Sequence, residues 1–204
     1  MKITDIKSQV KRAGRYSVFV DGKYRFSLGE VELLNSGLRV GQELSEAELA
    51  ELLDTAKADK AYDRALNFIA IRRRSEWEIR EYLKRKDKDY EPEIIETIID
   101  KLGEYNYVDD AEFAAAWVRN RRLLKATSQR RLQQELRQKR VADDVIQQVL
   151  AEDESDEQQI LRDLITKKRQ QSRYQDDLKL TQYLIRQGYN YPDIKSAIIL
   201  NPDV

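Results

Sequence analysis

From residue 58 onward, apolar residues recur at the spacing of an amphipathic helix. A residue that can cap a helix is followed by apolar residues four and eight positions later, and this trace occurs three times. Because residues four apart share one helical face, the pattern predicts the middle helix of three successive units. The three traces are Ser75/Ile79/Leu83, Ser128/Leu132/Leu136 and Asp176/Leu180/Leu184.

Each trace lies between two further helical segments. A first helix is expected in "AYDRALNFIAIRR", "DDAEFAAAWVRNRRLL" and "DEQQILRDLITKKRQ". A third is expected in "EPEIIETIIDKL", "ADDVIQQVL" and "YPDIKSAII", with the paired anchors Ile94/Ile98, Val145/Val149 and Ile194/Ile198. Since one apolar stripe cannot be buried alone, three helices close each small core. We predict a mainly α protein with three tandem three-helix repeats, stacked in an elongated arrangement, at residues 58–107, 108–152 and 153–204.

Before residue 58 the pattern indicates a small β-containing N-terminal module, at residues 1–57. The segment "YSVFVDGKYRFSL" has two β-rich runs around Asp21 and Gly22, a dipeptide that suits a two-residue hairpin turn. The segment "KITDIKSQ" is a candidate third strand. We expect one face of the hairpin to need a cover, and its residues are Phe19, Tyr24, Phe26 and Leu28.

Two short helices are the expected cover for this face, in "GEVELLNSG" and "SEAELAELLDTA". Ser45 and Glu48 form a capping box at the start of the second, and Gly37 is a helix stop for the first.

The composition excludes several classes of chemistry. The chain has no cysteine and no histidine, which argues against thiol nucleophiles, disulfides, common zinc sites and imidazole bases. It has no glycine-rich phosphate loop, so we expect no cofactor and no ATP site of its own. The absence of an 18-residue apolar run and of a signal-peptide pattern predicts a cytoplasmic protein without membrane contact.

The charges are segregated along the chain although they sum to zero. Residues 119–140 carry nine basic residues and one acid, whereas residues 141–160 carry seven acids and no base. Basic residues also recur near the ends of the three first helices. The candidates for contact with a filament or DNA are Arg72, Arg73, Arg74, Arg119, Arg121, Arg122, Lys125, Arg130, Arg131, Lys167, Lys168 and Arg169.

Two interpretations of these basic clusters remain open. Stacked repeats could align them into a stripe that follows a phosphate backbone or an acidic protein groove. Alternatively, they complement helix macrodipoles, since cations stabilise helix C-termini. A neutral but polarised chain suits a protein filament, or a filament with its DNA, better than bare DNA.

Other residues that suggest chemistry have structural explanations. Ser75 and Glu78 read as a capping box, and no histidine is present to activate the serine. Asp109 and Asp110 suit an N-cap better than a metal pair. Phe113 and Trp117 lie four residues apart on one helical face and are therefore both expected in the core, while Trp77 could be core or interface.

The ordered set of segments resembles the RecX family of regulators of the RecA recombinase. The resemblance is carried by "RRRSEWEIREYL", "YVDDAEFAAAWV" with the basic run after it, and "YLIRQGYNYPDIKSAI", and it covers nearly the whole chain. Family members often have glycine where this chain has Asn106 and Arg140. Both positions look like helix C-terminal stops, where a left-handed conformation favours glycine.

The resemblance implies a non-enzymatic, monomeric regulator in bacterial DNA recombination, repair and the SOS response. Its expected partners are the RecA filament and single-stranded DNA, directly or through the filament, with reduced ATPase and strand-exchange activity. The alternative is a sequence-specific duplex-DNA-binding protein of the helix-turn-helix type, because three-helix units resemble such domains. Against that alternative, the third helices of the first two repeats begin with acids, which DNA would repel.

Overall fold

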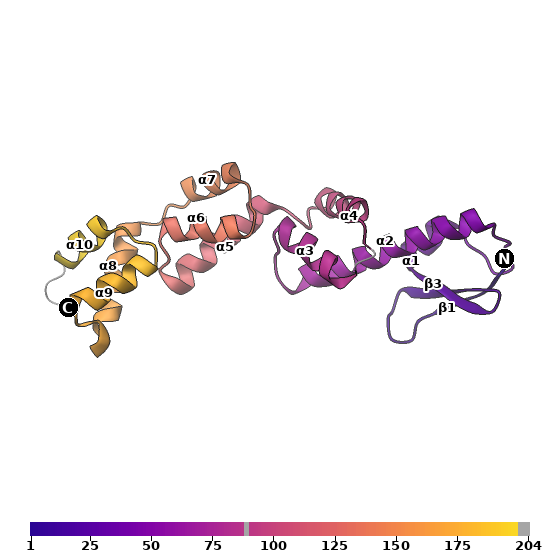
Figure 1. Cartoon of the computed structure of the whole chain (residues 1–204), viewed down its shortest axis with the longest axis horizontal. Coiled ribbons are helices and arrows are strands. Elements are labelled where there is room, and N and C mark those ends of the chain that lie inside the picture. The colour runs from indigo at the N-terminus through magenta and orange to yellow at the C-terminus, as the bar shows by residue number, and fades with distance from the viewer. Residues whose placement is uncertain (88–89, 200–204) are drawn as a thin grey trace. The chain divides into compact units, whose positions relative to one another are not determined.

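The computed structural model describes residues 1–87 and 90–199 and contains two compact units (Figure 1). Unit 1 comprises Met1–Arg73 and Glu78–Tyr107. Unit 2 comprises Arg74–Trp77 and Val108–Val204. The predicted third repeat extends to residue 204, so its last five residues lie outside the described part.

Unit 1 begins with a three-stranded antiparallel sheet in the order β1-β2-β3. Asp21 and Gly22 join β2 to β3, and both have positive φ (49° and 77°), as a type I′ turn requires. The predicted hairpin and the candidate third strand are therefore confirmed. The strands are β1 (Ile3–Ser8), β2 (Arg15–Val20) and β3 (Lys23–Gly29).

The predicted face of the hairpin is wrong at two positions. β2 pairs Val18 with Phe26 but Phe19 with Tyr24, so β3 contains one extra residue between them. Because side chains alternate along a strand, this bulge moves Tyr24 to the face opposite Phe26. Phe19 and Tyr24 pack edge to face outside the core, with ring centroids 6.1 Å apart. The buried face instead carries Ile3, Val18, Val20, Phe26 and Leu28.

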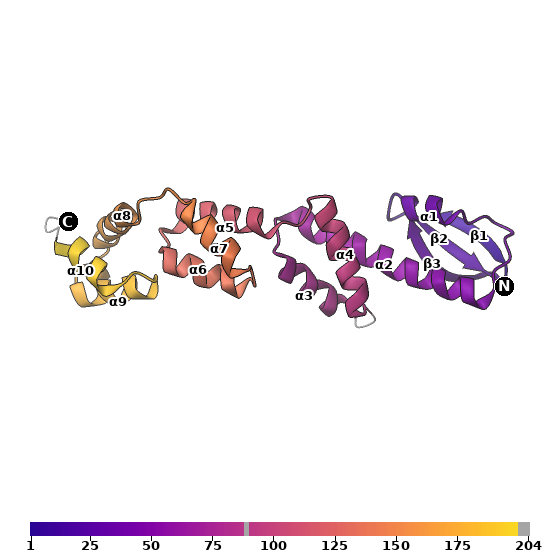
Figure 2. The same ribbon diagram turned by 90° about the horizontal axis from the view of Figure 1, so that it is seen from above.

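The cover of this sheet is confirmed, but the two helices expected at residues 45–56 and 61–73 are one. Helix α1 (Glu30–Ser36) ends at Gly37, which has φ 61°. Helix α2 (Glu46–Ile71) starts with the predicted Ser45–Glu48 capping box and continues without a break. The connecting residues "KADK" include no glycine or proline, so nothing interrupts the backbone hydrogen bonds. The predicted module boundary at residue 57 thus falls inside α2 (Figure 2).

The end of α2 joins two shorter helices, α3 (Glu76–Lys86) and α4 (Pro92–Glu104). The predicted apolar positions Ile79, Leu83 and Ile98 are buried, whereas Ile94 is partly exposed. The core of this group gains Ile95, since the buried stripe of α4 is rotated by one residue from the predicted anchor.

Unit 2 contains two three-helix groups, each with its own apolar core. The predicted positions Leu132, Leu136, Leu180 and Leu184 are fully buried. The first group is α5 (Asp110–Lys125), α6 (Gln129–Gln138) and α7 (Asp143–Ala151). The second is α8 (Glu157–Arg169), a short 3-10 helix η1 (Ser172–Tyr174), α9 (Asp177–Arg186) and α10 (Tyr191–Ile199).

Two serines in unit 2 make the same type of contact with the end of a helix. The hydroxyl of Ser75 donates to the carbonyl of Lys139, at 3.0 Å, and that of Ser128 donates to the carbonyl of Gln187, at 2.9 Å. Both serines are fully buried, and each acceptor is the residue that ends α6 or α9. The following amides donate to the acids that begin α5 and α8, in the pairs Glu76–Asp110 and Gln129–Glu157.

The predicted helix stops at Asn106 and Arg140 are confirmed. Asn106 has φ 55° and Arg140 has φ 58°, so both adopt the left-handed conformation in which glycine is most favourable. At the equivalent place after α9, Gly188 has φ 94°.

Candidate functional site

The predicted basic residues lie at several kinds of position on the two units. Arg72 ends α2, and Arg73 and Arg74 follow it in the connection to α3. The remaining candidates are on the C-terminal half of α5 (Arg119, Arg121, Arg122, Lys125), the first turn of α6 (Arg130, Arg131) and the last turn of α8 (Lys167, Lys168, Arg169).

Arg122 is an internal residue that ties α5 to the segment after α7. Its Nε donates to Asp153 at 2.8 Å, and a second guanidinium nitrogen donates to the carbonyl of Thr127 at 2.6 Å. The side chains of Arg122 and Asp153 are only 10% and 11% exposed. Burial acts to raise the pKa of Asp153, but hydrogen bonds from Ser155 and Arg122 hold this pKa below its ordinary value. An arginine held in this way has few donors left for a phosphate.

Arg121 belongs to a contact on the surface of the first three-helix group of unit 2. Its guanidinium carbon lies 4.6 Å from the centroid of the Trp117 ring, and its Nε donates to Glu135 at 2.7 Å. Trp117 donates its indole N–H to the same carboxylate, at 2.9 Å. Trp117 also packs against Phe113, which is buried as predicted, whereas Trp117 itself is only partly buried at the edge of the core. These contacts connect α5 to α6.

Three further candidates form contacts within their own units. Arg72 makes a two-pronged ion pair with Glu78, with distances of 2.9 and 3.0 Å. Arg169 pairs with Asp177 and donates to the carbonyl of Gln175 at 2.6 Å. Arg131 donates to the carbonyl of Arg186 at 2.6 Å. For these arginines the structure provides an intramolecular role.

Four candidates are exposed, and their side chains have no hydrogen bond or ion pair with the described residues: Arg119, Lys125, Arg130 and Lys167. Arg119 borders a surface hollow lined by the acids Glu152, Asp153 and Glu154, so its surroundings favour a cation. Arg130 lies in the first turn of α6, where the macrodipole disfavours positive charge. The helix macrodipole therefore explains the positive charges of Lys125 and Lys167, which lie at helix C-termini. It does not explain the positive charge of Arg130.

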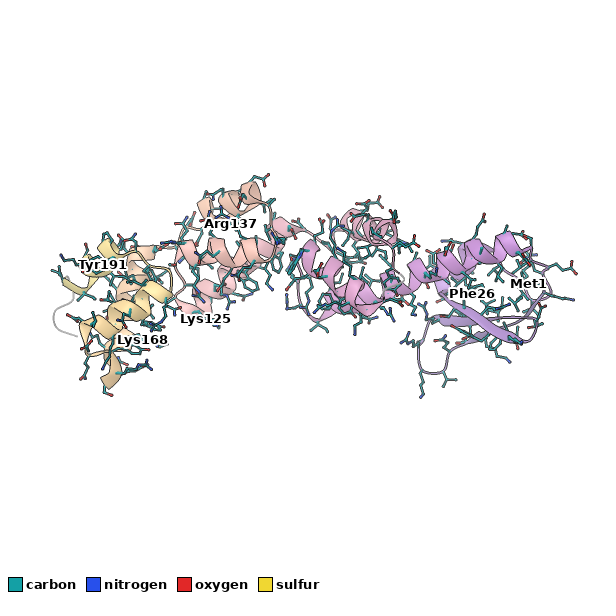
Figure 3. The ribbon with its side chains drawn as sticks, in the orientation of Figure 1. Met1, Phe26, Lys125, Arg137, Lys168 and Tyr191 are labelled. Atoms are coloured by element: carbon teal, nitrogen blue, oxygen red, sulfur yellow. The ribbon has the colours of Figure 1, made fainter. Side chains whose placement is uncertain are left out.

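A groove of about 380 Å³ brings basic residues of two predicted repeats together. Lys125 comes from the end of α5, and Lys167 and Lys168 come from the end of α8. Figure 3 marks Lys125 and Lys168 on the two helical groups of unit 2. The groove thus places Lys125 of the second predicted repeat near Lys167 and Lys168 of the third, while the alignment of all three basic clusters stays a prediction. We call this site the α5–α8 groove, and its lining is Arg122, Leu123, Leu124, Lys125, Ala126, Asp163, Leu164, Lys167, Lys168, Tyr183 and Gln187.

Two features of the site were missed by sequence reasoning. Leu123 and Leu124 are 82% and 78% exposed in this groove, although leucines in a helical pattern are usually assigned to the core. Their positions in the sequence could have indicated this exposure. They do not share the helical face that carries Phe113, Trp117 and Arg121 at intervals of four.

Unit 1 has a separate basic recess of about 580 Å³ that also lacked a clear sequence signal. It gathers Arg12 from the β1–β2 loop, Lys60 and Arg64 from α2, and Lys86 from α3. Lys60 and Arg64 are partly neutralised by Asp87, at 3.6 and 3.2 Å. The recess is therefore less basic than its lining suggests.

The residues assigned to helix capping behave largely as expected. Asp109 caps α5 by accepting hydrogen bonds from the amides of Ala111 and Glu112, at 2.8 and 3.0 Å. The capping box of Ser75 and Glu78 stays a prediction. Among the described residues, no three histidine, cysteine or acidic side chains are grouped to hold a metal ion. Within residues 1–87 and 90–199, every helix is too short or too polar to cross a bilayer.

The architecture defines a mainly α protein of three-helix groups with a small N-terminal sheet. Family comparisons agree with this class. Residues 1–45 match the regulatory protein RecX N-terminal domain, residues 61–102 the first RecX three-helix domain, and residues 109–150 the second. The chain belongs to the RecX family.

Individual relatives support the assignment over most of the chain. Regulatory protein RecX of Listeria welshimeri is 34% identical over 203 residues, covering 97% of this chain and 74% of the relative. Regulatory protein RecX of Bacillus subtilis is 31% identical over 201 residues, covering 96% and 75%. A crystal structure of regulatory protein RecX has 30% identity and a TM-score of 0.73, covering 95% of this chain and 97% of the other.

Proposed function

We propose that this chain regulates RecA by binding the RecA–single-stranded DNA filament and lowering its ATPase and strand-exchange activity. Membership of the RecX family supports this proposal, because the relatives are named regulatory proteins. We further propose that the chain acts as a monomer in the cytoplasm, without catalysis of its own. Steric bridging of successive RecA subunits would hinder the conformational cycle that hydrolysis and strand exchange need.

The observation that carries this proposal is the α5–α8 groove. Lys125 and Lys167 are exposed there without a side-chain hydrogen bond or ion pair to the residues that the structure describes, and they come from successive repeats. Basic side chains that form no ion pair within their own molecule are available to attract an acidic partner. We propose Lys125, Arg130, Lys167 and Lys168 as the main contacts of unit 2, with Arg119 at their edge.

The predicted division into modules is kept as part of this proposal. Residues 1–57, 58–107, 108–152 and 153–204 would act as successive contact modules along the filament. In this proposal Arg73 and Arg74 are the contact residues of the first repeat. Arg122, Arg131 and Arg169 hold their own unit together and contribute to binding only indirectly.

The test is the single-stranded-DNA-dependent ATPase of RecA, measured with increasing amounts of the full chain. We expect inhibition that saturates. The double variant Lys125→Glu with Lys167→Glu should need roughly five- to tenfold more protein for the same effect, since each exposed charge contributes up to ~1 kcal/mol. The matched control is Lys179→Glu with Lys195→Glu, which changes the net charge equally on exposed residues outside the groove.

Two results would contradict the proposed function, and a third would contradict the proposed contact site. An unchanged ATPase rate at stoichiometric excess would remove RecA as the target. Tight, sequence-selective binding to duplex DNA in the absence of RecA would support the helix-turn-helix alternative instead. Equal loss of inhibition in the groove variant and its control would reject the α5–α8 groove as the contact while leaving the function intact.

A further inference from the structure

The α5–α8 groove contains apolar surface that attraction to phosphate does not explain. Leu123 and Leu124 are mostly exposed, and they stand next to Lys125 on the last turn of α5. Exposure of this leucine pair to water is unfavourable, and the free energy falls when an apolar group of a partner covers the two side chains. The groove therefore has the composition of a protein-binding site.

The leucines are held in place by an ordered turn. Ala126 follows α5 in a left-handed conformation (φ 32°), and its carbonyl accepts a hydrogen bond of 3.0 Å from the hydroxyl of Tyr189. The next carbonyl, of Thr127, accepts a hydrogen bond from the Arg122 guanidinium at 2.6 Å. The Thr127 hydroxyl donates to the backbone carbonyl of Lys125 at 3.1 Å. Because the turn is fixed before binding, a partner would lose less ordering entropy on docking.

The charges in the groove indicate which charge a partner should carry. Lys125, Lys167 and Lys168 face one lining carboxylate, that of Asp163, while Arg122 is already neutralised by Asp153. Asp163 also accepts a hydrogen bond from Gln159, at 2.7 Å. The excess of cations favours an acidic occupant.

The ring in the groove is poorly placed to stack on a nucleotide base. Lys168 lies 4.7 Å from the centroid of the Tyr183 ring, and Tyr174 packs against the same ring at 5.1 Å. Binding of single-stranded nucleic acid relies on aromatic faces that are open to bases. Leucines do not supply such a face, so the apolar part of the groove favours a protein over DNA.

We propose that the α5–α8 groove binds an acidic protein segment whose apolar side chains cover Leu123 and Leu124. The volume of about 380 Å³ accommodates a few side chains of such a segment. The inference rests on the proposed function, under which the filament protein presents this segment and the DNA is contacted elsewhere.

The first experiment places the photo-crosslinking residue p-benzoylphenylalanine in the full chain, in place of Leu124. The variant is irradiated with RecA filaments assembled on labelled single-stranded DNA. The expected product is an adduct with RecA, absent when the same residue replaces Leu178, which is exposed on α9 outside the groove. An adduct with DNA or with a second copy of the chain would overturn the proposal, as would no adduct while ATPase inhibition persists.

The second experiment tests the groove without RecA, so that it remains informative if the proposed function fails. A fluorescent synthetic peptide of alternating glutamate and leucine is titrated with the full chain, and anisotropy reports binding. Leu123→Ser with Leu124→Ser should weaken binding roughly tenfold or more, because the apolar surface that the peptide would cover is lost. The control, Leu178→Ser with Ile185→Ser, removes two other exposed apolar residues of unit 2 and should bind as the unmodified chain.

An oligothymidine probe completes the comparison. Its affinity should be the same for the groove variant and the unmodified chain, since phosphate contacts do not depend on leucine. Failure of the peptide to bind, equal binding by the groove variant, or selective loss of oligothymidine binding would each overturn the proposed occupant.

Discussion

The hydroxyl of Ser128 donates a 2.9 Å hydrogen bond to the carbonyl of Gln187, and this contact leaves no room for a side chain at residue 188. A Cβ on Gly188 would collide with the Ser128 hydroxyl and approach the Cβ of Arg131 to 2.9 Å. The start of α6 thus packs directly on the backbone that ends α9. Ser75 makes the equivalent hydrogen bond with the carbonyl of Lys139, but there the next residue, Arg140, carries a side chain, so the close approach is specific to Gly188.

Gly188→Ala is therefore expected to destabilise unit 2 by about 2–4 kcal/mol, because left-handed strain adds to overpacking. Urea unfolding followed by circular dichroism measures the change. The matched control is Gly37→Ala, which has a similar positive φ of 61° but no atom within 4 Å of its Cβ. The control should lose only about 1 kcal/mol, and equal losses would disprove the packing argument.

Arg140→Gly is expected to increase stability, although it removes a charged residue. Arg140 is exposed and has φ 58°, a conformation that costs a residue with a Cβ roughly 1 kcal/mol. We predict a gain of about 0.5–1 kcal/mol in the free energy of unfolding. Arg140→Ala serves as the control, since it removes the charge and keeps the Cβ. A gain in the alanine variant as large as in the glycine variant would attribute the effect to charge.

Arg122→Ala is expected to cost about 3 kcal/mol, because it leaves the largely buried carboxylate of Asp153 without its cation. The folded-state pKa of Asp153 lies below its ordinary value, so this stabilisation is present at neutral pH and is lost as pH falls through the folded pKa. The difference between the variant and the unmodified chain should accordingly shrink in acid. Thermal unfolding at pH 7 and near pH 3 measures it.

The control for this prediction is Arg119→Ala on the same helix. Arg119 is exposed and has no ion pair with the described residues, so a change within about 0.5 kcal/mol is expected. Comparable losses at residues 119 and 122 would show that the Asp153 contact contributes little.

Tyr189→Phe is expected to alter the alkaline stability of unit 2. The Tyr189 hydroxyl donates to the carbonyl of Ala126. Burial raises the pKa of this hydroxyl most, and the nearby carboxylate of Glu157 raises it further. A raised folded-state pKa means that the stabilisation is complete below the unfolded value of about 10 and declines as pH rises above it. The variant should lose about 1 kcal/mol at pH 7.

Unfolding curves between pH 7 and pH 11 test this expectation. Above pH 10 the unmodified chain should lose its extra stability relative to Tyr189→Phe. The reason is that Tyr189 releases its proton when the chain unfolds at this pH, which favours unfolding, whereas phenylalanine has no proton to release. A constant difference across this range would show that Tyr189 ionises equally easily in the folded and unfolded states. Tyr191→Phe is a suitable control, since Tyr191 is exposed on α10.

The helices of the repeats could be predicted from sequence because their signals are local. The spacing of Leu132 and Leu136 specifies a buried stripe, and Ser45 and Glu48 specify a helix start, without reference to distant residues. The helix stops at Asn106 and Arg140 are instead expected from the resemblance to a family that often has glycine there, because arginine by itself does not favour a left-handed conformation. The bulge that separates Phe26 from Tyr24 could not be predicted, since strand register depends on how the whole sheet packs.

The sequence by itself therefore determined the order of the repeat helices, the caps at Ser45 and Asp109, and the recurrence of basic clusters. Only the tertiary structure decided that Arg122 is internal while Lys125, three residues later, is exposed. It also placed Leu123 and Leu124 in a groove with Lys167. The physical reason is that Arg122 finds its partner 31 residues away. Such pairing is set by the angles at which helices pack, which a periodic pattern leaves undefined.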